Sequence, residues 1–205
     1  ILRINKHKFL YLISPLKINK IFYDNLINVF RQKKVSFFQL RLKKEKFKKK
    51  LLIGKKIQKI CKKFKVKFLI NDDPYLAKRL NADGCHLGQK DTDILSARQI
   101  LGKKIIGITC HNSIKLAKTA IKYNPNYIAF GAFYPTKTKR VKYKANISIL
   151  KKIKKYSKLP IVAIGGINDV NYKKLLLNKA SFLAISGYIW NNKKLKPLEA
   201  IKKLK

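Results

Sequence analysis

The sequence predicts a (β/α)₈ barrel, an eight-stranded parallel ring with helices around the outside. Two observations lead to this prediction. Eight short apolar runs recur along the 205 residues, and segments of helical periodicity alternate with them. The hydrophobic share of 46% is enough to bury a core, which excludes a wholly disordered chain. No apolar run approaches the roughly 18 residues of a membrane-spanning helix, so we expect none.

The predicted strands are apolar on both faces, as strands of a parallel sheet covered on both sides must be. They are expected at Phe9–Ile13, Phe37–Leu40, Phe68–Ile70, Gly84–Leu87, Ile105–Ile108, Tyr127–Phe130, Ile161–Ile164 and Phe182–Ile185. Helices are expected at Ile21–Arg31, Leu51–Phe64, Pro74–Leu80, Ile94–Leu101, Ile114–Tyr123, Ile147–Tyr156, Val170–Asn178 and Leu195–Leu204. A proline such as Pro74 suits the first turn of a helix, where its missing N–H would be unpaired anyway.

An open doubly wound sheet is the competing architecture. It usually has five or six strands and a glycine-rich turn after the first one. Here the first predicted strand ends in Ser14-Pro15-Leu16, without such a turn. Since no linker-like segment interrupts the alternation, we expect one barrel domain over residues 1–205.

The chain is strongly basic, with 50 Lys and Arg against 9 Asp and Glu and a formal net charge of +41. Arginine suits bidentate recognition of bases and phosphates, but only Arg3, Arg31, Arg41, Arg79, Arg98 and Arg140 are present. The many lysines are spread along the chain, so we interpret them as a solvated surface and keep a nucleic-acid face as an alternative. Such a surface still attracts small anions.

Two further features of composition bear on function. Five of the nine acidic residues lie between Asp72 and Asp93, which makes cation binding a strong hypothesis for that segment. The three cysteines, Cys61, Cys85 and Cys110, show no zinc-binding spacing. We interpret them as buried, reduced thiols of a cytoplasmic protein.

The second predicted strand leads into a group of polar side chains. Gln39, Arg41 and Lys43 alternate, so they share one face, and a barrel strand can turn that face inward. Unpaired buried charge is costly, which makes an anion clamp a better interpretation than core packing. The alternative is a strand that frays into a lysine-rich surface loop.

Two carboxylates follow neighbouring predicted strands. Asp72 comes after the third run and Asp91 after the fourth, and both belong to the end of a barrel where active sites lie. Mg²⁺ is often held by one or two protein carboxylates together with substrate phosphates. The alternative is that Asp73 caps a helix and Asp91 serves a turn.

The fifth run ends with a hydroxyl and a histidine. Thr109 can orient a substrate, and His111 is a candidate acid or base. A lone histidine is more often structural, however, and we expect the same of His86 inside the fourth run.

Phosphate-binding features follow the last three runs. Residues 136–140 combine two hydroxyls and three cations, typical of a phosphate-binding loop. Gly165-Gly166 and Ser186-Gly187 close the seventh and eighth runs, where this fold commonly holds phosphate. Together the features predict two anionic substrates, one of them a Mg²⁺-bound diphosphate. No Ser/His/Asp or Cys/His arrangement supports a covalent hydrolase.

Seven segments resemble the thiamine-phosphate synthase family, in order and spacing, from about Tyr11 to Ile189. They are QLRLK at 39–43, INDD at 70–73, ADGCHLGQKD at 82–91, GITCHN at 107–112, PTKTK at 135–139, AIGGI at 163–167 and AISG at 184–187. Members of this family are (β/α)₈ transferases of thiamine biosynthesis. They join 4-amino-2-methyl-5-hydroxymethylpyrimidine diphosphate to a thiazole phosphate with Mg²⁺, and diphosphate leaves before the thiazole nitrogen attacks.

The resemblance also implies residue roles. The pyrimidine diphosphate would be held by Gln39, Arg41, Lys43, Asn71, Thr109 and Lys139. Within that set, Arg41, Lys43 and Lys139 would be catalytic. Asp72 and Asp91 would bind Mg²⁺. The thiazole phosphate would be held by Thr136, Thr138, Gly166, Ser186 and Gly187.

Two other functions stay open at this point. A related thiazole tautomerase would share the barrel and the thiazole phosphate site without needing a Mg²⁺-diphosphate site. A nucleic-acid-binding module would show affinity that survives near physiological salt. The expected partners are small phosphorylated substrates, with no specific nucleic acid and no membrane. A homo-oligomer is left open.

Overall fold

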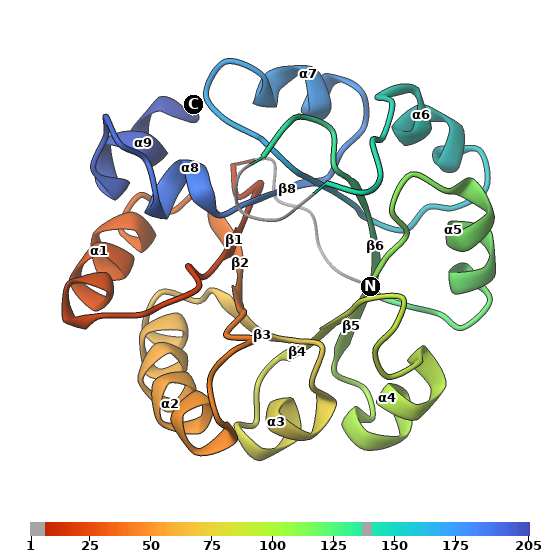
Figure 1. Ribbon diagram of the computed structural model, residues 1–205. Coiled ribbons are helices and arrows are strands. Elements are labelled where there is room, and N and C mark those ends of the chain that lie inside the picture. The colour runs from red at the N-terminus through yellow and green to blue at the C-terminus, as the bar shows by residue number, and fades with distance from the viewer. Residues whose placement is uncertain (1–6, 137–140) are drawn as a thin grey trace.

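The computed structural model describes residues 7–136 and 141–205, and its strands close into one parallel barrel in chain order (Figure 1). The strands are β1 (Leu10–Ile13), β2 (Val35–Leu40), β3 (Lys67–Asn71), β4 (Gly84–Leu87), β5 (Ile105–Thr109), β6 (Tyr127–Gly131), β7 (Ile161–Ile164) and β8 (Phe182–Ile185). The predicted barrel is therefore confirmed and the open doubly wound sheet is excluded. β8 pairs directly with β1, which closes the ring.

Helices surround the barrel, as Figure 1 shows in a view along its axis. They are α1 (Lys20–Phe30), α2 (Phe47–Lys63), α3 (Pro74–Arg79), α4 (Ile94–Leu101), α5 (Ile114–Ile121), α6 (Ser148–Lys154), α7 (Tyr172–Leu177), α8 (Gly187–Trp190) and α9 (Pro197–Lys203). Of the helices in the described part of the chain, none has the length and apolar character to cross a membrane.

Apart from the start of α2, the predicted helix boundaries lie within two residues of the observed ones. α2 begins at Phe47 rather than Leu51, because its first turn is lysine-rich and carries no apolar pattern. α7 begins later than predicted, since the Asn168 side chain accepts from the N–H groups of Val170 and Asn171 in a turn. α8 was not predicted, and α9 begins at Pro197 rather than Leu195.

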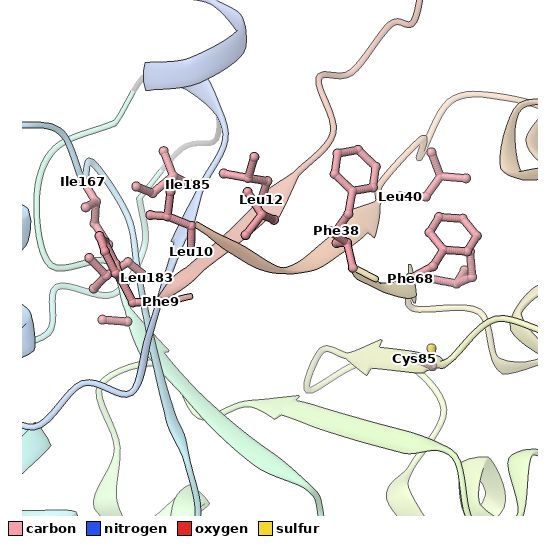
Figure 2. Packing of buried hydrophobic residues seen from close by; sticks show 14 of the residues in the cluster. Phe9, Leu10, Leu12, Phe38, Leu40, Phe68, Cys85, Ile167, Leu183 and Ile185 are labelled. Atoms are coloured by element: carbon pink, nitrogen blue, oxygen red, sulfur yellow. The ribbon is translucent and has the colours of Figure 1, made fainter. Parts of the chain in front are cut away.

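Alternation along the strands divides the core into two layers. Outward side chains such as Leu10, Phe38, Phe68 and Leu183 pack beneath the helices, and Figure 2 shows part of this layer. The inward layer fills the barrel with Tyr11, Ile13, Phe37, Leu69, Tyr127, Ala129, Val162, Phe182 and Ala184. Large inward rings plug the barrel and form the floor beneath its open, C-terminal end.

Gly107 on β5 makes room for one of these inward rings, that of Tyr127. A Cβ at Gly107 would lie 1.9 Å from Cζ of Tyr127, far inside contact distance. The bare glycine therefore lets the Tyr127 ring lie across the barrel. This packing sets the position of the Tyr127 hydroxyl, which lies 2.8 Å from both the Tyr11 hydroxyl and Nδ1 of His86.

Candidate active site

A cavity of about 700 Å³ opens at the C-terminal ends of the strands. The described candidate site residues all line it: Gln39, Arg41, Lys43, Asn71, Asp72, Asp91, Thr109, Thr136, Gly166, Ser186 and Gly187. Thr138 and Lys139 lie outside the described residues. Residues at or just after the ends of seven strands, β2 to β8, thus meet at one space, although they are scattered through the sequence.

The predicted anion clamp lies where β2 ends. Gln39 is only 2% exposed, and its Nε2 has no hydrogen-bond partner in the described part of the chain, so it is a donor available to a ligand. The backbone N–H of Arg41 donates to Ser14 Oγ at 2.9 Å, which fixes the chain just after the strand. Burial lowers the pKa of Arg41, and Asp72 opposes that shift. The guanidinium nevertheless stays charged, because arginine is protonated at any physiological pH.

Lys43 joins the clamp to the carboxylates. Its Nζ lies 2.7 Å from Oδ2 of Asp72. Asp72 has a left-handed backbone, with φ of 62°, and its N–H donates to the carbonyl of His86 at 2.8 Å. That hydrogen bond holds the residue across the ends of β3 and β4, with its carboxylate at the cavity. Although burial raises the pKa of Asp72, Lys43 outweighs it and the net shift is downward.

Asp91 faces the same point from the loop after β4. Its Oδ2 accepts from the N–H of Gly88 at 3.0 Å. A Cβ placed on Gly88 would lie 2.3 Å from Asp91 Oδ2 and 3.8 Å from Asp72 Oδ1, so the two carboxylates flank one small space. Burial and the neighbouring Asp72 both raise the pKa of Asp91. Mutual repulsion of this kind is relieved when a cation lies between the two groups.

The capping hypothesis for this segment is confirmed for Asp73, whose side chain accepts from Leu76 N at 2.9 Å at the start of α3. Asp91 also stabilises its own turn through Gly88. Asp72 caps nothing and pairs with Lys43 instead. No group of three or more His, Cys, Asp or Glu side chains suited to a metal occurs in residues 7–136 and 141–205. A two-carboxylate site suits Mg²⁺ whose remaining ligands are phosphate oxygens and water.

Below the carboxylates, four side chains form a line of hydrogen bonds. Thr109 Oγ1 lies 2.8 Å from His86 Nε2, and His86 Nδ1 lies 2.8 Å from the Tyr127 hydroxyl. That hydroxyl in turn lies 2.8 Å from the hydroxyl of Tyr11. Burial lowers the pKa of His86 to about 4, despite the opposing charge of Asp72, so its ring is neutral at pH 7.

Sequence reasoning missed Tyr11 and Tyr127 as site residues and expected only a structural role for His86. Tyr11 and His86 line the cavity, and the Tyr127 hydroxyl is hydrogen-bonded to both of them. Because apolar residues flank Tyr11, Tyr127 and His86 in the sequence, their strands were predicted to belong to the core throughout. The signal that could have found them is alternation, since each shares the inward face of its strand with a residue at the strand end.

The opposite side of the cavity has the features of a phosphate cradle. Gly165 and Gly166 both have positive φ, 104° and 64°. A Cβ at Gly166 would lie 2.3 Å from the carbonyl oxygen of Pro135, so the loops after β6 and β7 pack backbone to backbone. Ser186 precedes α8, whose first N–H groups have no partner within the helix. These groups point to a place for an anion beside Thr136.

The segment after the sixth strand contributes a wall. Two backbone hydrogen bonds of 2.9 Å link Ala132 to residues 143–145. The Ala132 N–H donates to the Tyr143 carbonyl, and the Ala132 carbonyl accepts from the Ala145 N–H. The Tyr143 ring stacks on His111 at 4.2 Å between centroids. His111 also lines the cavity with φ of 51°, and its role as acid or base stays a hypothesis.

Comparison with known sequences gives a consistent result. A family model described as thiamine monophosphate synthase matches residues 10–189. The thiamine-phosphate synthase of Pelagibacter ubique is 72% identical over 204 residues, which cover 99% of this chain and 98% of that protein. The thiamine-phosphate synthase of Nitrosomonas eutropha is 40% identical over 158 residues, which cover 77% and 74% of the two chains.

Solved structures agree with the sequence relatives. Thiamine phosphate pyrophosphorylase from Pyrococcus furiosus matches with a TM-score of 0.85 and 26% identity, covering 97% of this chain and 94% of that one. Orotidine 5′-phosphate decarboxylase from Pyrococcus horikoshii matches at 12% identity and a TM-score of 0.63, covering 93% and 95%. The second similarity shows the barrel fold alone.

Proposed function

We propose roles for the residues of the cavity, starting from one premise. The chain belongs to the thiamine monophosphate synthase family, and its activity is that of a thiamine-phosphate synthase, a transferase. The proposed substrates are 4-amino-2-methyl-5-hydroxymethylpyrimidine diphosphate and a thiazole phosphate, simple or carboxylated. The products are thiamine phosphate and pyrophosphate. The bond between the pyrimidine methylene and the diphosphate oxygen breaks, and the thiazole nitrogen then bonds to that methylene carbon.

The single observation that carries this assignment is the shared cavity of the clamp and the carboxylate pair. Lys43, Asp72 and Asp91 meet in a cavity that is also lined by Gln39, whose buried Nε2 has no hydrogen-bond partner among residues 7–136 and 141–205. An anion alone would not favour the two carboxylates, and a cation alone would not favour Arg41 and Lys43. A diphosphate that carries a divalent cation satisfies both.

The proposed roles follow from charge. Arg41 and Lys43 neutralise the departing diphosphate. We propose the same role for Lys139, which follows β6 in the sequence. Thr109 and Asn71 contact the same substrate, and the Gln39 amide donates to its ring. Because fixed charges stabilise a leaving group without needing to reorganise, this set lowers the barrier to departure.

Asp72 and Asp91 are the residues that would hold Mg²⁺, and their facing carboxylates fit that ion. When bound, Mg²⁺ supplies further electrostatic stabilisation of the leaving diphosphate. On the opposite side, the proposed thiazole phosphate site comprises Thr136, Thr138, Gly166, Ser186 and Gly187. This arrangement aims the two substrates at each other across the cavity.

The tautomerase alternative leaves the carboxylate pair and the clamp without a function, so we favour the synthase. We interpret the lysine-rich surface as attracting anionic substrates rather than a specific nucleic acid. We also propose a cytoplasmic location, where the unpaired thiols Cys61, Cys85 and Cys110 stay reduced.

A coupling assay tests the proposal. Purified protein receives both substrates with Mg²⁺, and thiamine phosphate is converted to fluorescent thiochrome and measured. Product that disappears with EDTA and with Asp72→Ala supports both the reaction and the carboxylate site. A folded protein that makes no product would contradict the synthase assignment.

Single-turnover kinetics test the role of Lys139. Lys139→Ala is expected to slow the departure of pyrophosphate from the pyrimidine more than it weakens thiazole phosphate binding. The reverse pattern would place Lys139 with the thiazole phosphate instead. Lys137→Ala, two residues away in the sequence, is the matched control for a general loss of positive charge.

A further inference from the structure

The hydrogen-bonded line beneath the carboxylates joins four strands. Tyr11, Tyr127, His86 and Thr109 lie on the inward faces of β1, β6, β4 and β5, and the three links between them are each 2.8 Å long. Tyr11 and Tyr127 are both buried, and of the two only Tyr11 lines the cavity. Thr109 is at the other end, where the line meets the site.

The direction of the protons along this line follows from counting donors and acceptors. Each hydroxyl has one proton to donate. In the described part of the chain, Tyr127 is the only partner of the Tyr11 hydroxyl. If Tyr127 donated to Tyr11, the proton of Tyr11 would be buried without an acceptor, which is costly. Tyr11 therefore donates to Tyr127.

The rest of the line follows from that end. The Tyr127 hydroxyl, having accepted from Tyr11, donates to Nδ1 of His86. The imidazole proton is then on Nε2 and is donated to Thr109 Oγ1. The same count of donors and acceptors excludes a doubly protonated His86 ring. Such a ring would donate to the Tyr127 hydroxyl, which would then have to donate to Tyr11 and leave the Tyr11 proton without an acceptor.

The proton position decides what Thr109 offers to a ligand. A threonine that donates to Nε2 presents only lone pairs to the cavity, and these repel an anionic oxygen. A threonine that accepts from Nε2–H keeps its own proton to donate outward. The backbone there is also fixed, since the Gln89 side chain donates to the Thr109 carbonyl at 2.5 Å.

We propose that Tyr127 and His86 are positioning residues, which hold the imidazole in its Nε2–H form and thereby make the Thr109 hydroxyl a donor to the diphosphate. The proposal rests on the function above in one respect, that Thr109 faces the diphosphate. Gly107 contributes to the same arrangement of side chains, because its missing Cβ lets the Tyr127 ring reach His86.

The first test needs no substrate. In protein labelled with ¹⁵N-histidine at pH 7, we expect the His86 ring to show a protonated Nε2 and an unprotonated Nδ1. The signals are assigned by their loss in His86→Gln. Tyr127→Phe removes the donor to Nδ1, so the Nε2–H form should no longer be the only one. Tyr11→Phe is the matched control, because Tyr127 can still donate to Nδ1 and the Nε2–H form should persist. A protonated Nδ1 in the unmodified protein would overturn the proposal.

The second test asks whether Tyr127 acts through Thr109. The readout is Mg²⁺-dependent pyrophosphate binding by calorimetry, so it stands even if the coupling reaction fails. Thr109→Val and Tyr127→Phe should each weaken binding about tenfold, the loss expected for one hydrogen bond to a charged group. The double variant should bind no more weakly than Thr109→Val alone, and Thr109→Ser should retain affinity. Additive losses, or full affinity in Thr109→Val, would overturn the proposal. Circular dichroism confirms that each variant is folded.

Discussion

Replacing Gly107 by alanine tests how the inward layer sets the site. The new Cβ would lie 1.9 Å from Cζ of Tyr127 and 2.3 Å from two further ring carbons. Because carbon atoms normally pack at about 3.5–4.0 Å, the ring or the strand must move by roughly 2 Å. The Tyr127 ring has no free space to enter, since it is fully buried beside Phe37 and Tyr11.

The expected cost comes from two sources. Overpacking a tight core costs about 1–3 kcal/mol. A displaced ring also loses its hydrogen bonds to His86 and Tyr11, at about 1 kcal/mol each. We therefore expect Gly107→Ala to lower the free energy of unfolding by about 3–5 kcal/mol, measured by urea denaturation.

A matched control separates this clash from the general effect of alanine. Gly102 lies shortly before β5, the strand that carries Gly107, but a Cβ there meets nothing within 4 Å, although its φ is 58°. Gly102→Ala should cost about 1–3 kcal/mol from backbone strain alone, since its φ of 58° with ψ of −125° suits glycine, and Tyr127→Ala should not relieve that cost.

A double-mutant cycle completes the test. With Tyr127→Ala the clash disappears, so Gly107→Ala should then cost less than about 1 kcal/mol in that background. If the two substitutions proved additive, or if Gly107→Ala were as mild as Gly102→Ala, the packing argument would be refuted.

Three further predictions follow from the site. Asp91→Ala should reduce Mg²⁺-dependent turnover by about 1,000-fold, because metal stabilisation of the leaving group is worth several kcal/mol, while the protein stays folded by circular dichroism; near-normal turnover would contradict the metal role. His86 has a pKa of about 4 when folded and about 6.5 when unfolded, so the unfolded chain takes up the proton first. Stability should therefore fall as pH drops from about 6.5 to about 4, by up to roughly 1.4 kcal/mol per pH unit, and His86→Gln should flatten that slope in urea titrations; an unaltered slope would show that His86 does not cause it. Ser14→Ala removes the acceptor for the Arg41 N–H, and should cost about 1–2 kcal/mol while Ser14→Thr retains most of the stability; equal losses in the two variants would exclude the hydrogen bond as the cause.

The sequence by itself was sufficient for the architecture. Short runs that are apolar on both faces, alternating with helical periodicity, describe a buried parallel sheet with helices around it. It was also sufficient to gather the described candidate residues in one cavity. The reason is geometric: all strands of a parallel barrel end on the same side, so residues that follow different strands converge however far apart they are in the chain.

The strand pattern does not predict which of those side chains contact one another. The ion pair between Lys43 and Asp72 depends on the left-handed turn at Asp72, and sequence spacing does not specify that turn. The short helix α8 was missed because four residues carry no measurable periodicity.

The line from Tyr11 to Thr109 was decided by tertiary structure alone. Tyr11 and Tyr127 are 116 residues apart, and their hydroxyls meet only because the register of the closed sheet and the gap at Gly107 bring them together. Residue types and strand ends follow from local patterns, since hydrophobic periodicity is a local property. The direction of a ring inside a barrel depends on every side chain packed around it, and that information exists only in the folded protein.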